Sequence, residues 1–228
     1  LGLFGIAFSV AAFPALSVAA AEKNGKEFFS LLSIATRRIL FFVLPLSALM
    51  IVFRAQFVRV ILGSGQFNWE DTIVTFTVLA WLSVSLFAQS LIPLFARGFF
   101  ALQNTKTPLY IALGSELLHI VLTVLLWRSS YFSIEMLAMV FSIATIVNLV
   151  FLYGALRRQS LYWDDAQMFA PAMKIVLAAV LAGLFAQASK YVFALTTNEL
   201  DTFFEVFLHL IFGLMIGGGA YIVLCLWL

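Results

Sequence analysis

Long apolar stretches alternate with short polar connectors along almost the whole chain. Seven stretches hold about 20 mostly apolar residues, the length that an α-helix needs to cross a hydrocarbon core of roughly 30 Å. They are continuous, whereas the strands of a membrane barrel would be short segments of alternating hydrophobicity. The pattern therefore predicts an all-α integral membrane fold with about seven transmembrane helices, at Leu1–Ala21, Arg38–Phe57, Thr72–Ala96, Thr107–Trp127, Ile134–Leu156, Pro171–Phe193 and Glu205–Leu228.

Proline interrupts three of these stretches, at Pro14, Pro45 and Pro93. Proline has no N–H to donate, so it removes one helical hydrogen bond and tends to kink the helix. Such kinks can serve as flexing points in transporters, although neighbouring helices also tolerate them as purely structural features. At the start of the fourth stretch, Thr107 is predicted to cap a helix whose first turn holds Pro108.

The composition supports a membrane environment. The 228 residues are 64% hydrophobic and 11% charged, while soluble domains carry about a quarter of their residues charged. The net charge of +2 is small and no basic patch is present, which argues against nucleic acid as a partner. The single cysteine, Cys225, rules out an intrachain disulfide. The chain begins inside an apolar stretch, which favours a fragment cut within a helix over a signal peptide.

The basic residues predict the orientation, because cytoplasmic connectors of membrane proteins carry an excess of lysine and arginine. One side of the predicted bundle holds nine basic residues and the other holds Arg54, Arg59, Arg128 and Lys190. The first side is expected to be cytoplasmic, which places the C-terminus in the cytoplasm. Its basic residues are Lys23, Lys26, Arg37, Arg38, Arg97, Lys106, Arg157, Arg158 and Lys174.

Glu116 is the carboxylate that lies deepest in an apolar stretch, about half way along the fourth. His119 and Thr123 follow at spacings that place all three side chains on one helical face. Ionisable groups are costly in hydrocarbon, so this face should point to the protein interior or to a wet cavity. We expect a cation- or proton-binding site there. The structural alternative is a neutral carboxylic acid that is hydrogen-bonded to His119 or to another helix.

Other polar residues within the apolar stretches favour contacts between helices. Gln89 in the third stretch and Asn148 in the fifth are expected to form interhelical hydrogen bonds rather than to bind substrate directly. Gly213 and Gly217 have the Gly-x-x-x-Gly spacing that is typical of close helix approach. No zinc-binding histidine pair, nucleophile elbow or phosphate-binding glycine loop occurs, so no catalytic or metal-ligating residue is predicted.

The connector between the third and fourth stretches reads Arg97-Gly-Phe-Phe-Ala-Leu-Gln-Asn-Thr-Lys-Thr-Pro108. It resembles the Arg-Ala-Phe-Tyr-Ala-x-x-Asp-Thr-x-Thr-Pro signature of the MurJ/MviN family of lipid II flippases. The segments 13–17 and 62–72 resemble the family's Leu-Pro-x-Leu-Ser helix and Gly-x-Gly-x-Phe-x-x-x-Asp-Thr loop, in the same order. The resemblance runs through the chain, most weakly after Gln159. At the cytoplasmic hinge its motif residues are Arg97, Asn104, Thr105, Lys106, Thr107 and Pro108.

The resemblance implies a fold of fourteen transmembrane helices in two lobes, within the multidrug/oligosaccharidyl-lipid/polysaccharide exporter superfamily. Residues 1–158 would be helices eight to twelve of the C-lobe, and residues 159–228 the last two helices, which line a lipid-tail groove. The family moves lipid II, the lipid-linked peptidoglycan precursor, from the cytoplasmic to the periplasmic leaflet of the bacterial inner membrane by alternating access. The implied partners are the undecaprenyl-linked lipid, membrane lipids and an N-terminal lobe that this chain lacks.

The resemblance also implies a coupling cation. Family members can bind one with polar residues a turn apart on the eleventh helix and a hydroxyl on the twelfth. The shared motifs place His119, Thr123 and Ser142 at those positions, and with Glu116 they form the predicted coupling site. A histidine there favours H⁺ over Na⁺, and no other cofactor is expected.

Three alternatives stay open at this point. Another exporter of the same superfamily would carry an O-antigen or polysaccharide lipid, or cationic drugs. A membrane-embedded enzyme would use Glu116 and His119 for acid–base chemistry and would release an altered product. A degenerate lipid-binding or scaffold protein would transport nothing.

Overall fold

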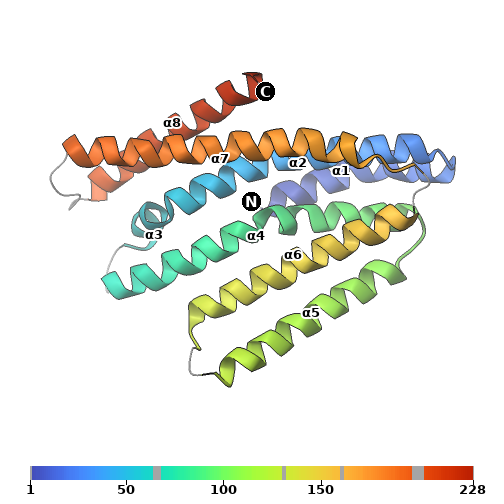
Figure 1. Ribbon diagram of the computed structural model, residues 1–228, viewed down its shortest axis with the longest axis horizontal. Coiled ribbons are helices and arrows are strands. Elements are labelled where there is room, and N and C mark those ends of the chain that lie inside the picture. Colours follow the sequence, from blue (N-terminus) through green and yellow to red (C-terminus); the bar gives the residue numbers. More distant parts are fainter. Residues whose placement is uncertain (1, 64–67, 130–131, 160–161, 197–202, 228) are drawn as a thin grey trace. The chain divides into compact units, whose positions relative to one another are not determined.

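The computed structural model describes the chain except residues 1, 64–67, 130–131, 160–161, 197–202 and 228 (Figure 1). Its described residues form α-helices joined by short connectors. All of the helices except the nine-residue α3 are long and apolar enough to cross a membrane, which confirms the predicted all-α fold with seven spans. The helices are α1 Gly2–Ala21, α2 Gly25–Val52, α3 Arg54–Leu62, α4 Trp69–Ala101, α5 Lys106–Trp127, α6 Ile134–Gln159, α7 Asp165–Thr196 and α8 Phe203–Trp227.

The helices differ from the predicted spans mainly at their polar ends. The second helix begins at Gly25 instead of Arg38, the fourth ends at Ala101 instead of Ala96, and the seventh begins at Asp165 instead of Pro171. Hydropathy marks the part of a helix that lies in hydrocarbon, whereas the backbone hydrogen bonds continue into polar turns. The second predicted span also stops early, at Val52, and the following residues form the separate helix α3.

Asparagine begins three of the helices with one recurring arrangement. In each case the asparagine side-chain oxygen accepts the backbone N–H of the residue three positions later, and that residue's side chain bonds back to the asparagine. This reciprocal pair satisfies N–H groups that lack a partner in the first turn of a helix. The pairs are Asn24–Glu27 before α2, Asn68–Asp71 before α4 and Asn104–Thr107 before α5.

The predicted cap of α5 is therefore wrong. Thr107 lies inside the helix, which begins at Lys106, and its N–H donates to Asn104 Oδ1 at 3.1 Å. Asn104 Nδ2 donates in turn to Thr107 Oγ1 at 2.9 Å. Asparagine accepts with an oxygen on a longer arm than threonine, so it reaches across the first turn from outside the helix.

The chain forms two compact units. Unit 1 comprises Leu1–Val43 and Ser85–Ala172, and unit 2 comprises Leu44–Val84 and Met173–Leu228. Three helices run from one unit into the other, and two of these crossings lie beside a proline, Pro45 in α2 and Pro171 in α7. The predicted division at residue 158 concerns correspondence with the family's lobes, and it stays a prediction.

Unit 1 is stabilised by contacts between its helices and by one polar cluster. In it α5 lies antiparallel beside α6 (Figure 1), and α1 approaches α4 so closely that a Cβ on Gly5 would overlap the backbone of Ser90. Where α6 gives way to α7, the carboxylate of Asp165 accepts hydrogen bonds from Tyr153 at 2.6 Å and Trp163 at 3.1 Å. It also pairs with Arg157 at 2.5 Å, which fastens the start of α7 to α6.

In unit 2, α8 contacts its neighbours through glycine. A Cβ at Gly213 would overlap the ring of Phe53, and one at Gly217 would meet Leu49 and Ala186. Leu49, Phe53, Ala186 and Leu210 form a buried apolar cluster at this contact. The close helix approach that the Gly-x-x-x-Gly spacing predicts is thus confirmed.

Replacing Gly213 with alanine should destabilise the protein, because the added methyl group must displace the Phe53 ring from a packed cluster. Overpacking of this kind costs about 1–3 kcal/mol of unfolding free energy. Thermal unfolding of the protein in detergent micelles measures the change.

Gly218→Ala is the matched control in the same helix, because a Cβ there meets no atom within 4 Å. It should leave stability unchanged or raise it by up to about 1 kcal/mol, the helix-propensity difference between alanine and glycine. Equal melting temperatures for the two variants would contradict the packing account.

Candidate functional site

Polar side chains from three helices of unit 1 meet in one pocket. Its volume is about 240 Å³, and α4, α5 and α6 each contribute to its wall. Glu116 and His119, predicted as part of the coupling site, lie here together with Gln89 and Asn148, which were predicted as helix–helix contacts. The other lining residues are Ile92, Pro93, Ser115, Phe141, Ala144 and Thr145.

Glu116 and His119 lie one helical turn apart on α5. Glu116 Oε2 is 3.7 Å from His119 Nδ1, too far for a hydrogen bond but within reach of an ion pair when the imidazole is protonated. The Glu116 side chain is 69% exposed and that of His119 is 29% exposed, so the carboxylate is at the rim and the imidazole is deeper. The His119 ring also meets Phe141 edge-on, with centroids 5.8 Å apart.

The hydroxyl groups in the wall donate their protons to backbone carbonyls. Ser115 Oγ donates its proton to the carbonyl of Ala112 at 2.9 Å, and Thr145 Oγ1 donates to the carbonyl of Phe141 at 2.8 Å. A hydroxyl that has given its proton to the backbone keeps its acceptor capacity. Both hydroxyls therefore act as oxygen acceptors.

Two further candidate oxygens belong to lining residues of α4 and α6. Asn148 Oδ1 is buried and has no hydrogen-bond partner among the described residues. Pro93 lacks an N–H, so the carbonyl of Gln89 four residues earlier loses its helical donor. Hard cations such as Na⁺ are typically coordinated by carboxylate, amide and backbone oxygens of this kind. The arrangement is therefore suited to a cation, and the Glu116–His119 pair is suited to a proton.

The remaining two residues of the predicted coupling site lie elsewhere. Ser142 is buried but does not line the pocket, and it donates to Ser85 Oγ at 3.1 Å. Gln89 Nε2 donates to the same oxygen at 3.0 Å, so these serines position the Gln89 side chain. Thr123 does not line the pocket.

Ser85, Thr145 and Pro93 were not selected from the sequence as parts of a site. The available signal was spacing: Ser85 precedes Gln89 by four residues and Thr145 precedes Asn148 by three, which places each pair on one helical face. Thr145 and Pro93 line the pocket, while Ser85 is connected to it through the hydrogen bond from Gln89.

The motif residues of the hinge have structural contacts. Arg97 belongs to α4, and its guanidinium donates to Ser9 Oγ and, at 3.2 Å, to the carbonyl of Ile6, both on α1. Thr105 and Lys106 are exposed at the turn, and Pro108 is buried in the first turn of α5. Together with the Asn104–Thr107 cap, these contacts fix how the chain turns from α4 into α5. Residues 64–67 of the motif at 62–72 lie outside the described part of the chain.

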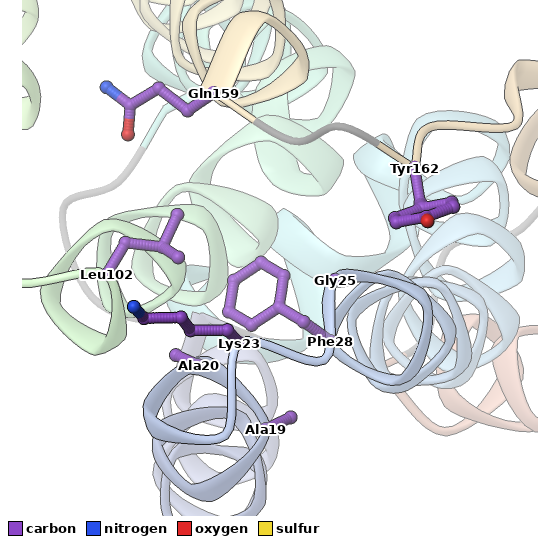
Figure 2. A pocket seen from close by; sticks show the side chains of 8 residues that line it. All are labelled: Ala19, Ala20, Lys23, Gly25, Phe28, Leu102, Gln159 and Tyr162. Atoms are coloured by element: carbon purple, nitrogen blue, oxygen red, sulfur yellow. The ribbon is translucent and has the colours of Figure 1, made fainter.

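A second pocket adjoins this turn but offers less chemistry. It has a volume of about 210 Å³, and Lys23 is the charged residue among the described ones that line it. Figure 2 shows the Lys23 side chain reaching toward Leu102, just past the end of α4, with the Phe28 ring beside it. No acceptor cluster comparable with that around Glu116 is present among these residues.

Comparisons of the sequence with known proteins agree on one family. A family model described as "Lipid II flippase MurJ" matches residues 1–211. A probable lipid II flippase MurJ from Buchnera aphidicola subsp. Baizongia pistaciae is 26% identical over 97% of this chain and 42% of its own length. A probable lipid II flippase MurJ from Rhizobium meliloti is 30% identical over 79% of this chain and 34% of its own length.

The fold agrees as well. A solved structure of lipid II flippase MurJ in an inward closed conformation superposes with a TM-score of 0.76 at 23% identity. The match covers 98% of this chain and 42% of that one. The chain thus spans less than half the length of the relatives that it matches.

Arg97→Gln should destabilise the protein, because it removes the charged donor that joins α4 to α1. The buried Ser9 hydroxyl then loses the hydrogen bond that it accepts from Arg97. Hydrogen bonds that involve a charged group contribute about 1.5–3 kcal/mol. Lys106→Gln removes the same charge from an exposed position of the same motif, so it should change the unfolding free energy little. Thermal unfolding of both variants checks this, and equal destabilisation would contradict the anchoring role of Arg97.

Proposed function

Because this chain belongs to the lipid II flippase MurJ family, we propose that it forms the C-terminal half of a lipid II flippase. It is a multi-pass membrane protein, and its relatives are named for moving a lipid rather than for a chemical reaction. The proposed transport carries lipid II from the cytoplasmic to the periplasmic leaflet of the inner membrane. A polar headgroup cannot cross hydrocarbon uncompensated, so it needs a polar path that opens to each side in turn.

The pocket at Glu116 is the main support for the proposed cation coupling. Oxygen acceptors from α4, α5 and α6 converge there, although each of those helices is otherwise strongly apolar. A cation or proton in this pocket would neutralise the Glu116 carboxylate and hold the three helices in one arrangement. A ligand shifts a conformational equilibrium only through its different affinity for the two states. Cation binding here would favour one state of the alternating-access cycle.

A segment equivalent to the N-terminal part of the longer relatives is the proposed partner of α5. In the apolar 18-residue segment of α5, only 6% of the residues are buried, whereas 44% are buried in the corresponding segment of α2. The 69% exposed side chain of Glu116 lies on this poorly covered helix. An exposed carboxylate in the middle of a membrane span is costly, so helices from the rest of the protein are expected to cover it.

The orientation is part of the proposal. The basic residues gather on alternate connectors, which supports a cytoplasmic C-terminus. In this orientation the Arg97–Pro108 hinge faces the cytoplasm.

Two other functions make different predictions. Another exporter of the superfamily would move other lipids or drugs and would not prefer lipid II. A membrane-embedded enzyme using Glu116 and His119 would return a chemically altered lipid, whereas a flippase returns lipid II unchanged. Mass spectrometry of the recovered lipid separates the flippase from the enzyme.

Glu116→Gln should strongly reduce the gradient-dependent flipping of lipid II, because the amide keeps the shape but loses the charge that binds the cation. Coupling free energies of about 1–3 kcal/mol correspond to about 5- to 150-fold. The assay uses the protein at the full length that its gene encodes, in liposomes with labelled lipid II. Proton and Na⁺ gradients are imposed separately.

Glu70→Gln is the control, because it removes one negative charge from an exposed first turn of α4. It should flip lipid II like the unmodified protein. Cation coupling at this pocket is wrong if Glu116→Gln responds normally to both gradients, or if neither gradient affects the unmodified protein.

A further inference from the structure

A second polar pocket, in unit 2, has the opposite chemistry. Its volume is about 340 Å³, and it lies where α2 ends and α3 begins, beside α4 and α7. Two basic side chains and one amide line it, and no carboxylate is among the described lining residues. The lining residues are Ile51, Val52, Arg54, Ala55, Phe76, Gln187 and Lys190.

The basic side chains of Arg54 and Lys190 each contact a backbone carbonyl and an aromatic ring. Arg54 Nη1 donates to the carbonyl of Ile51 at 3.3 Å, and the guanidinium lies over the Phe76 ring, 5.3 Å from its centroid. Lys190 Nζ donates to the carbonyl of Val52 at 3.0 Å and lies 5.7 Å from the centroid of Phe53. A guanidinium has five N–H donors and an ammonium has three, so these contacts occupy only a small part of each.

The protein groups around the pocket do not balance its charge. Arg54 is close enough to Lys190 to act on it electrostatically, and Lys190 is close enough to act on His209. The carbonyls at the end of α2 account for the two hydrogen bonds, but a helix C-terminus carries only roughly half a negative charge. The positive charges of Arg54 and Lys190 therefore remain largely uncompensated by the described lining, which favours an anion as their counterpart.

The arrangement of donors favours phosphate. A planar guanidinium beside an ammonium matches the tetrahedral oxygens of a phosphate, to which arginine donates two parallel bonds. The rest of the lining is largely apolar, through Ile51, Val52 and Phe76. Lys190 lies at the end of the α7 span, which runs to Tyr191, so the pocket lies near headgroup depth.

We propose that Arg54 and Lys190 bind the phosphate of an anionic lipid headgroup in this pocket. The phosphate lies between the guanidinium and the ammonium, while the glycerol part contacts Ile51, Val52 and Phe76. The lining of this pocket shares no residue with the pocket at Glu116, and the proposal does not depend on the proposed transport. Its ligand is a resident or regulatory lipid, held by charge and by apolar contact together.

The test measures lipid binding by the full-length protein in detergent, with short-chain dioctanoyl phosphatidylglycerol as the probe. Arg54→Gln and Lys190→Gln should each weaken binding about tenfold or more, as expected for the loss of a charge-assisted hydrogen bond. Arg54→Lys keeps the charge and should bind with intermediate affinity. Because that variant retains the cation, it also keeps the test valid if Arg54→Gln fails to fold.

Arg59→Gln is the matched control. Arg59 is an exposed residue of the same helix α3, where its guanidinium lies 5.2 Å from the centroid of Trp69, and it does not line the pocket. Its loss should leave binding unchanged. Equal weakening by all three neutral substitutions would show general surface attraction and would overturn the site.

Two further arms identify the ligand. Dioctanoyl glycerol, which has no phosphate, should bind at least about tenfold more weakly if the charged contacts dominate. Inorganic phosphate should compete only weakly, because it lacks the apolar part. Binding of inorganic phosphate as tight as that of the lipid would overturn the lipid proposal in favour of a free anion.

Discussion

A polar group is costly in hydrocarbon, and both the helical fold and the two polar pockets follow from that cost. Backbone groups meet it by forming helices, whose hydrogen bonds are all internal. Side chains within the spans meet it by donating to carbonyls of their own helix, as Ser115 and Thr145 do, or by gathering with other polar groups, as Gln89, Ser85 and Ser142 do. Polar residues scattered along the sequence therefore concentrate into a few places, which include the pocket at Glu116 and the pocket at Arg54 and Lys190.

The two pockets differ in the kind of group that they present. The pocket at Glu116 presents oxygen lone pairs, while the pocket at Arg54 and Lys190 presents N–H donors. The first is suited to a cation or proton and the second to an anion, although both form in chain segments that are mostly apolar. Each occurs beside an interruption of a helix: Pro93 in α4 near the first, and the break between α2 and α3 at the second.

The seven spans were predictable because hydropathy and length are properties of the sequence alone. The polar ends of α2, α4 and α7 were not, since hydrogen bonds continue a helix beyond its apolar part. Helical spacing placed Glu116 and His119 on one face, but their meeting with Gln89 and Asn148 depends on how three helices pack, which periodicity does not contain. Thr123 shares the face of Glu116 yet lies seven residues away, about 10 Å along the helix axis, which places it outside a pocket of about 240 Å³.

A double-mutant cycle between Glu116 and Asn148 tests whether the two residues bind one cation. The stabilisation of the full-length protein by cations is measured in lipid nanodiscs, with Na⁺ at constant ionic strength and with protons across the range in which histidine titrates. If the two residues bind one cation, Glu116→Gln, Asn148→Leu and the double variant should lose nearly the same stabilisation. Strictly additive losses, or an unchanged response in the double variant, would contradict a shared cation site in this pocket.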